Sequence, residues 1–522
     1  MTLVLVAMLI AGCGRGDGRP PETSMDAGVV PTSAGLVRGG VAADHRLFSG
    51  VPYAAPPVGP LRWRPPSPVP PWSGLRDATH QGSRCIQDAA NNLDPDRASS
   101  EDCLNLDVWT PPPSNQLRPV LVWIHGGGFI NGSGDIYDAR RMVSRGDIVV
   151  VTINYRLGAL GFLAHPALGP VGDVGNYGLA DQQAALRWVR DNIANFGGDP
   201  AKVTIGGESA GAMSVCDHLV APGSAGLFRA AIIQSGPCQA QGALPAAEQR
   251  SIDYAVGLGC GLMELAAQCL RDLPADKLHG APTYSDFGGI AVTGPVTGTA
   301  ALPVDPVTAF AEGSAARVPV LIGSNRDEFT LFVAGQFMRQ GQDYTAERYP
   351  HLLSETFGAD AAAVAAHYPP DRFGGSVPLA YSAAITDRAF ACLADRMSED
   401  LVKTEPVYAY EFNDPNAPAP EPLQDLPFEV GASHSLELRY LFDVGDAPPL
   451  NPAQQRLADQ MIDYWAQFVA TGSPSVAGQP DWPQLGDDPA AGERMSLQPD
   501  GSRVITSFEK THQCPFWASL KG

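Results

Sequence analysis

The segment Val203–Gly211 constrains the fold of this chain more than any other stretch. Its first residues, Val-Thr-Ile at 203–205, are β-branched and predict the end of a buried strand, while residues 212–219 predict a helix. Between them, Gly207–Gly211 matches G-x-S-x-G, a sharp turn that lifts Ser209 above a sheet. A chain with 56 glycines also produces this motif in ordinary loops, so the flanking strand and helix are what favour a nucleophile here.

Strand and helix patterns alternate along most of the chain. Helical periodicity follows Asn176 and, in a second stretch, Asn451-Pro452, where Gly472 and Pro474 end the pattern. Such alternation predicts an α/β fold with a parallel sheet covered on both faces. The other clear strands are predicted over residues 34–39, 119–124, 148–153, 230–236, 318–323 and 407–412.

Composition excludes some functions. The formal net charge is −21 and there is no long basic run, which argues against nucleic acid and against an anionic membrane surface as partners. Hydrophobic residues make up 44% of the chain, enough for a large core. The charge favours a neutral or cationic substrate.

The N-terminus predicts export. Residues 1–13 contain a short apolar run that ends in Ile10-Ala11-Gly12-Cys13, which resembles the lipobox of bacterial lipoproteins. Cys13 would then carry a lipid anchor; the alternative is an ordinary signal peptide with a coincidental cysteine. No Lys or Arg precedes the apolar run, so we expect translation to start further upstream. Residues 14–32 are polar and rich in Gly and Pro, and predict a flexible tether.

Cysteine usage agrees with export. The chain has nine cysteines but no C-x-x-C pair and no histidine at zinc spacing, so we expect no metal site. If Cys13 is lipidated or removed, the even number that remains is compatible with disulfides.

A nucleophilic serine needs a histidine base that a carboxylate orients, and in this fold class the chain order is serine, acid, histidine. Among the histidines that follow, His434 lies in a polar, glycine-containing loop after the last clear strand. Glu328 follows the end of a strand, and its neighbour Asp327 remains a rival for the acid. The candidates for the base are His279, His351, His367, His434 and His512.

Glycines 126–128 follow another predicted strand. They could cradle a phosphate, but the Lys-Ser/Thr pair of a P-loop is missing. The alternative is an oxyanion loop, in which glycines let backbone N–H groups point at a developing negative charge.

Taken together, the chain resembles the type-B carboxylesterase family, which includes cholinesterases, liver-type carboxylesterases and bacterial esterases. The resemblance begins near residue 32 and implies one α/β-hydrolase domain over 33–522, with a mostly parallel central sheet and helices on both faces. It is carried by Phe48–Trp63, Ser100–Leu106, Trp123–Phe129, Asn154–Gly158, Asn176–Gln182, Phe196–Pro200, Gly206–Gly211 and His434–Glu437.

The resemblance also implies roles for individual residues. It implies hydrolysis of a carboxylic ester without metal or cofactor. The short loop between Cys85 and Cys103 favours small or medium esters over long-chain lipids, and the oligomeric state stays open. The nucleophile would be Ser209, the acid Glu328 and the base His434. The oxyanion would be stabilised by the backbone N–H groups of Gly127, Gly128 and Ala210. Two further residues, Glu208 and Ser235, would support the site.

Covalent and ionic links carry over in the same way. The resemblance implies three disulfides and two ion pairs, and leaves open whether Cys216 and Cys238 pair. Unlike the loop of cholinesterases, the loop between Cys85 and Cys103 is short and holds no aromatic residue, so we expect neither choline-ester specificity nor a lid for long-chain lipids. The implied links are Cys85–Cys103, Cys260–Cys269, Cys392–Cys514, Arg62–Glu101 and Arg156–Asp181.

Two other functions stay open at this point. The same chemistry could serve a specialised substrate such as a lactone, an amide, or a drug or toxin ester, with pocket residues in the range Ser285–Arg372 deciding. A non-catalytic binding protein on the same fold is the other alternative.

Overall fold

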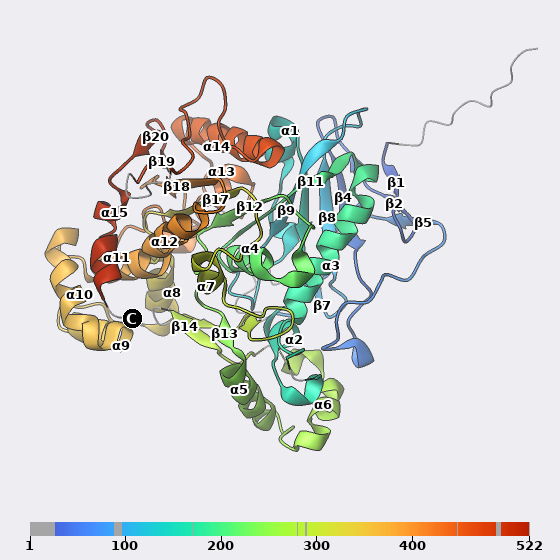
Figure 1. The fold of residues 1–522 in the computed structure, drawn as a ribbon, viewed down its shortest axis with the longest axis horizontal. Coiled ribbons are helices and arrows are strands. Elements are labelled where there is room, and N and C mark those ends of the chain that lie inside the picture. Colours follow the sequence, from blue (N-terminus) through green and yellow to red (C-terminus); the bar gives the residue numbers. More distant parts are fainter. Residues whose placement is uncertain are drawn as a thin grey trace, which may run out of the picture.

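One large sheet organises the molecule (Figure 1). The computed structural model describes residues 27–87, 97–170, 172–278, 280–287, 290–445, 447–486 and 492–520. In these residues the sheet has 11 strands, in the spatial order β20 (Arg503–Ile505), β19 (Arg494–Leu497), β18 (Val407–Phe412), β17 (Val320–Asn325), β12 (Ala230–Gln234), β11 (Gly198–Glu208), β9 (Arg118–Ile124), β10 (Val149–Ile153), β8 (Asn105–Thr110), β4 (Arg46–Pro52) and β3 (Gly40–Val41).

The strands from β19 to β10 in that order run parallel, and antiparallel strands complete both edges. This confirms the predicted α/β class and the mostly parallel sheet. The central strands are buried on both faces, which is why they read as continuous apolar runs in the sequence.

Helices cover both faces of the sheet. Alternate residues of β9 show the division, since Val120 and Val122 belong to one core cluster and Leu121 and Trp123 to the other. The first face packs against α3 (Tyr177–Asn192), α4 (Ala210–Val220), α7 (Pro306–Ala311) and α12 (Cys392–Leu401). The second packs against α1 (Arg140–Gly146), α13 (Leu438–Leu441) and α14 (Pro452–Thr471), which lie at the top of Figure 1.

Two smaller clusters extend the molecule beyond the sheet. One contains α2 (Gly158–Phe162), α5 (Leu244–Gly257) and α6 (Met263–Asp272), with α5 and α6 at the bottom of Figure 1. The other contains α8 (Thr330–Gln340), α9 (Tyr349–Phe357), α10 (Ala361–His367) and α11 (Val377–Thr386). The C-terminal helices α15 (Phe508–Thr511) and α16 (Cys514–Ser519) follow the last strand.

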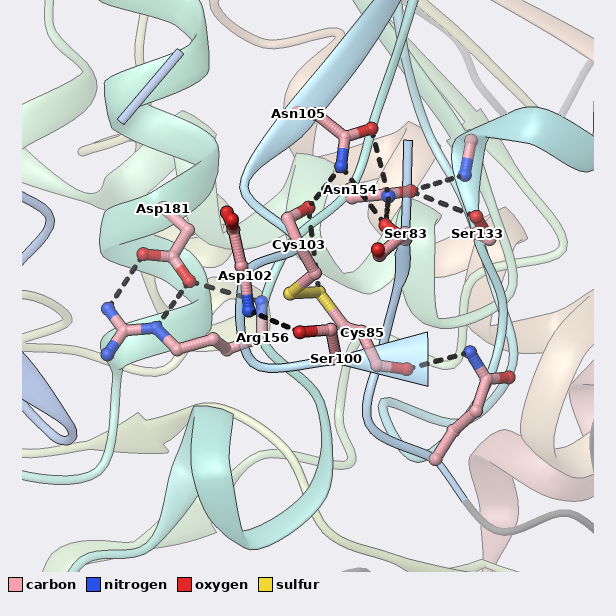
Figure 2. Close-up of a disulfide and its surroundings, with 12 residues drawn as sticks. Ser83, Cys85, Ser100, Asp102, Cys103, Asn105, Ser133, Asn154, Arg156 and Asp181 are labelled. Carbon is pink, nitrogen blue, oxygen red and sulfur yellow. Dashed lines mark hydrogen bonds and ion pairs between the residues drawn. A yellow bond between two sulfur atoms is a disulfide. The ribbon is translucent and has the colours of Figure 1, made fainter. Parts of the chain in front are cut away.

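The structure contains the three expected disulfides and a fourth one, Cys216–Cys238, which the sequence left open. Both expected ion pairs are present as well. Arg62 binds Glu101 through two contacts of 2.6 Å, and Arg156 binds Asp181 through two contacts of 2.7 Å. Figure 2 shows the second pair beside the Cys85–Cys103 disulfide.

The predicted C-terminal boundary of the tether was wrong. The tether was expected to reach residue 32, but β1 (Val29–Pro31) pairs with β2 (Leu36–Arg38), which in turn pairs with β5 (Leu75–Asp77). Backbone pairing therefore draws the end of the predicted tether into the fold. Cys13 and residues 14–26 lie outside the described residues. Within the described part of the chain, none of the helices has the length and apolar character needed to cross a bilayer.

Candidate active site

The turn between β11 and α4 holds Ser209 in a strained conformation. Its φ is +56° and its ψ −123°, a region that residues with a side chain rarely adopt. A Cβ on Gly207 would lie 2.5 Å from the carbonyl carbon of Gly211, and one on Gly211 would lie 2.0 Å from the oxygen of Ile124. Both flanking glycines are therefore sterically required, and the serine side chain stays partly exposed at the N-terminus of α4.

A histidine and a glutamate meet beside this turn. Nδ1 of His434 lies 2.6 Å from Oε2 of Glu328, and both side chains are almost completely buried. The backbone N–H of Asn325, at the end of β17, donates to the other glutamate oxygen at 2.7 Å. These two bonds fix the carboxylate against the imidazole.

The rival acid, Asp327, faces elsewhere. Its Oδ2 accepts a hydrogen bond from the backbone N–H of Ala432 at 2.9 Å. Asp327 therefore fastens the loop that carries His434, while Glu328 is the residue in contact with the ring.

The second nitrogen of His434 faces the end of β11. Nε2 lies 3.1 Å from Oε1 of Glu208, the residue before Ser209. Within the described part of the chain, Nε2 has no hydrogen-bond partner, and so it accepts none from the serine hydroxyl in this state. Nε2 therefore lies next to the strained turn and against the Glu208 carboxylate, without a hydrogen bond to Ser209.

Buried carboxylates set the protonation of this ring. Burial by itself would lower the pKa of His434, but Glu208 and Glu328 outweigh it and raise the pKa to about 9. Burial raises the pKa of Glu208, and the opposing charge of His434 limits that rise. The charge of the ring and the charge of Glu208 therefore depend on each other.

The glycine loop after β9 packs on the same turn. A Cβ on Gly126 would lie 2.8 Å from the carbonyl oxygen of Glu208 and 3.1 Å from Cβ of Ser209. Gly127 and Gly128 have φ of +101° and +60°, and the carbonyl of Gly127 accepts hydrogen bonds from the N–H groups of residues 130 and 131 at 3.1 Å. The loop closes on itself, and it contacts Ser209 through Gly126, while Ala210 opens α4.

The predicted support role of Ser235 has no hydrogen bond behind it. Ser235 is buried with a φ of +53°, and among the described residues its hydroxyl has no partner. Its backbone N–H binds the carbonyl of Gly323 at 2.9 Å, so its recorded contact is to the neighbouring strand β17.

A cavity of about 640 Å³ opens beside the histidine. Gly126, Gly127, Glu208 and His434 line the cavity, which therefore reaches the glycine loop and the end of β11. Much of the remaining wall is apolar and comes from Ile136, Tyr137, Leu331, Pro418, Leu423, Leu436 and Val444. This wall lies largely outside the range 285–372 in which the sequence analysis expected the pocket.

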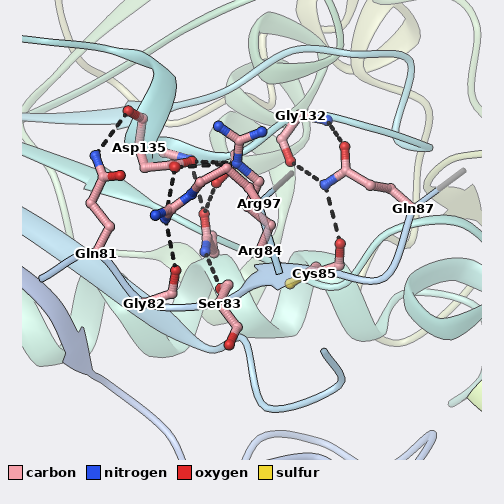
Figure 3. Close-up of polar contacts among 12 residues, drawn as sticks. Gln81, Gly82, Ser83, Arg84, Cys85, Gln87, Arg97, Gly132 and Asp135 are labelled. Carbon is pink, nitrogen blue, oxygen red and sulfur yellow. Dashed lines mark hydrogen bonds and ion pairs between the residues drawn. The ribbon is translucent and has the colours of Figure 1, made fainter. Parts of the chain in front are cut away.

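Part of the cavity wall is polar and lies near the Cys85–Cys103 disulfide, and Figure 3 shows the contacts of these polar residues. The side-chain amide of Gln87 makes a pair of 3.1 Å hydrogen bonds with the backbone N–H and carbonyl of Gly132. Arg84 and Arg97 both pair with Asp135, at 2.9 and 3.0 Å. These contacts join the disulfide loop to the glycine loop.

Sequence reasoning missed two residues of the site. Glu437 is fully buried and accepts hydrogen bonds from Asn325 at 2.6 Å and Gln234 at 3.2 Å, and burial together with Glu208 and Glu328 raises its pKa to about 8. Ser435 donates to Glu208 at 2.5 Å. Both lie in the His434–Glu437 motif, which was the available signal.

One acidic group elsewhere could be taken for a metal site. The carboxylates of Asp395, Glu399 and Glu509 lie within 4.8 Å of one another on the wall of a separate cavity. Arg494 pairs with Asp395, so a positive charge of the protein already balances one of the three carboxylates.

Comparisons with known proteins identify a family and several relatives. A model of the carboxylesterase family matches residues 26–517. The chain is 34% identical to fumonisin B1 esterase of Sphingopyxis macrogoltabida, over 90% of this chain and 88% of that one, and 32% identical to human cocaine esterase, over 98% and 93%. A solved PNB esterase structure superposes with a TM-score of 0.79 at 31% identity and covers 94% of this chain and 100% of its own.

Proposed function

Because this chain belongs to the carboxylesterase family and is a carboxylic ester hydrolase, we propose that it hydrolyses small to medium esters through an acyl-enzyme on Ser209. In this proposal His434 is the general base and Glu328 the acid that orients it. The single observation that supports it best is the 2.6 Å contact between these two side chains, next to the strained turn that presents the serine.

The reaction proceeds in two halves. His434 takes the proton of Ser209 at Nε2 as the serine oxygen attacks the ester carbonyl carbon. The N–H groups of Gly127, Gly128 and Ala210 stabilise the oxyanion, each by about 3 kcal/mol in the transition state. The imidazolium then protonates the departing alcohol, which leaves an acyl group on the serine.

Water completes the cycle by the same path. His434 takes a proton from water, whose oxygen attacks the acyl carbon, and then returns that proton to Ser209 as the acid is released. The lack of a serine–histidine hydrogen bond in this state does not oppose the scheme, because such bonds often tighten only when substrate is bound.

The test is the variant Ser209→Ala, assayed with p-nitrophenyl acetate. We expect loss of nearly all turnover and of labelling by a fluorophosphonate probe, with unchanged thermal unfolding. Turnover retained by the folded variant would remove Ser209 from the mechanism. A wild-type chain that the probe does not label would instead favour a non-catalytic binding role.

A specialised ester substrate is the second candidate. The observation that favours it is the cavity of about 640 Å³, which could hold a group much larger than acetate, together with 34% identity to an esterase named for fumonisin B1. A panel of short acyl, aryl, lactone, amide and polyester-acid substrates separates the candidates by kcat/KM.

We further propose that the protein is exported, with residues 1–13 as signal peptide and Cys13 as a lipid-anchored residue that a tether joins to the domain. The four disulfides support this, because such bonds persist in oxidising compartments. The mass of the mature N-terminal peptide decides whether Cys13 is the first residue and is lipidated.

A further inference from the structure

Ser435 stands out because it has a side chain where the backbone favours glycine. It follows His434 directly, with a φ of +67°. Glu437, two residues after Ser435, accepts a hydrogen bond from Asn325, and Ala432, two residues before His434, donates one to Asp327. The loop around the histidine is therefore held on both sides. Backbone strain of this kind is concentrated at functional sites in proteins.

The hydroxyl of Ser435 reaches across to the nucleophile turn. Its Oγ donates a hydrogen bond of 2.5 Å to Oε1 of Glu208. The same oxygen lies 3.1 Å from Nε2 of His434. One carboxylate oxygen therefore receives the serine hydroxyl and faces the histidine nitrogen that exchanges protons with substrate in the proposed mechanism.

We propose that Ser435 is a positioning residue that holds the Glu208 carboxylate ionised and aimed at Nε2 of His434, and thereby stabilises the imidazolium formed in each half of the reaction. This inference rests on the proposed function. It assigns Ser435 an action through Glu208, without contact to the reacting atoms.

The charges around the ring allow this role. Three carboxylates face His434, from the end of β11, from the turn after β17 and from its own loop, namely Glu208, Glu328 and Glu437. Phe332 and Phe390 pack against the ring, with centroids 5.1 and 5.4 Å away, and keep this side apolar. Burial raises the pKa of Glu208, and the hydrogen bond from Ser435 counteracts that rise. Without the hydroxyl, the carboxylate would hold its charge less well next to the ring.

The test compares Ser435→Gly with Ser435→Ala. Both remove the hydroxyl, but glycine also relieves the strained backbone, so an effect shared by both variants belongs to the hydroxyl. We expect kcat to fall about 3- to 10-fold. This is a smaller effect than the complete loss of a hydrogen bond to a charged group would cause. We expect the acidic limb of the kcat/KM profile to move to lower pH by about 0.5, because a less ionised Glu208 raises the pKa of His434 less.

A double-mutant cycle with Glu208→Gln tests the route of action. If Ser435 works through Glu208, Ser435→Gly causes no further pH shift in the Glu208→Gln background. Equal shifts in both backgrounds would overturn the proposal. Ser435→Asn, which tolerates a positive φ and carries an N–H donor, is expected to restore part of the effect. Ser114→Ala, on an exposed loop, is the control and should leave the profile unchanged.

Failure of this inference can be told from failure of the proposed function. The pKa of His434 is read directly by NMR of histidine-labelled protein, with His434→Gln to assign the signal, and needs no turnover. A lower pKa in Ser435→Gly supports the inference even if the enzyme hydrolyses none of the esters tried. An unchanged pKa in an active enzyme refutes it.

Discussion

At the scale of single residues, the turn that carries Ser209 requires a glycine without a side chain at position 211. An alanine Cβ at position 211 would lie 2.0 Å from the carbonyl oxygen of Ile124, closer than real Cβ contacts. We therefore predict that Gly211→Ala displaces Ser209, abolishes fluorophosphonate labelling and costs about 1–3 kcal/mol of stability, the range for overpacking. Labelling and chemical denaturation measure the two effects.

The matched control is Gly257→Ala. This glycine ends α5, and a Cβ there would meet no atom within 4 Å. The control should label like the wild type and keep its stability or gain slightly. If Gly211→Ala is labelled as strongly as the wild type, the turn can shift without loss of function. That result would contradict the steric argument.

Which carboxylate contacts His434 is also decided at the scale of single residues. Glu328 and Asp327 are adjacent and both follow β17, so strand ends and chain order could not separate them. The structure separates them because successive side chains point in different directions, one to His434 and one to the N–H of Ala432.

At the scale of elements, a disulfide fastens α4, the helix that follows Ser209. Cys216 lies on α4 and Cys238 follows β12, and both are fully buried. We predict that the variant with alanine at both positions unfolds with about 3 kcal/mol less stability, since the bond closes a loop with a sequence separation of 22. Denaturant unfolding measures the loss.

Peptide mapping under non-reducing conditions checks the link itself and should yield one fragment joining residues 216 and 238. Free thiols at these two positions in the native protein would contradict the prediction. Removal of the Cys260–Cys269 disulfide, between α5 and α6, is the comparison, and its smaller separation of 9 predicts a smaller loss.

At the scale of the whole molecule, His512 joins the C-terminus to the sheet and to the helices beside the site. Its ring lies 2.5 Å from Asp387 and 2.7 Å from Glu411 on β18, close to the Cys392–Cys514 disulfide. Burial opposes protonation, but the two carboxylates raise the pKa of His512 to about 10.

This ion network predicts a pH-dependent stability. The unfolded histidine has a pKa of about 6.5, so the folded state holds a proton that the unfolded state releases between pH 6.5 and 10. The contribution of the protonated His512 ring to the free energy of unfolding is therefore fully present below about pH 6.5 and is lost as pH rises through about 10. We predict that the stability difference between wild type and His512→Gln is largest at pH 6 and shrinks toward pH 10.

Chemical denaturation at pH 6, 8 and 10 measures this difference. His80→Gln serves as the control, because the side chain of His80 is 86% exposed, and it should show almost no difference at any of these pH values. A difference for His512→Gln that stays constant from pH 6 to 10 would mean that the ring is not held protonated by its two acids.

The sequence by itself determined what depends on a few neighbouring residues. The sharp turn at Ser209, the buried parallel strands and the cap at Asn451 are local, because sterics, periodicity and capping act within short windows. The tertiary structure alone decided what joins distant positions. Glu328 and His434 are 106 residues apart, and Ser435 and Glu208 are 227 apart. No local pattern encodes which of two adjacent carboxylates, or which hydroxyl, arrives there, because packing of the whole sheet sets those directions.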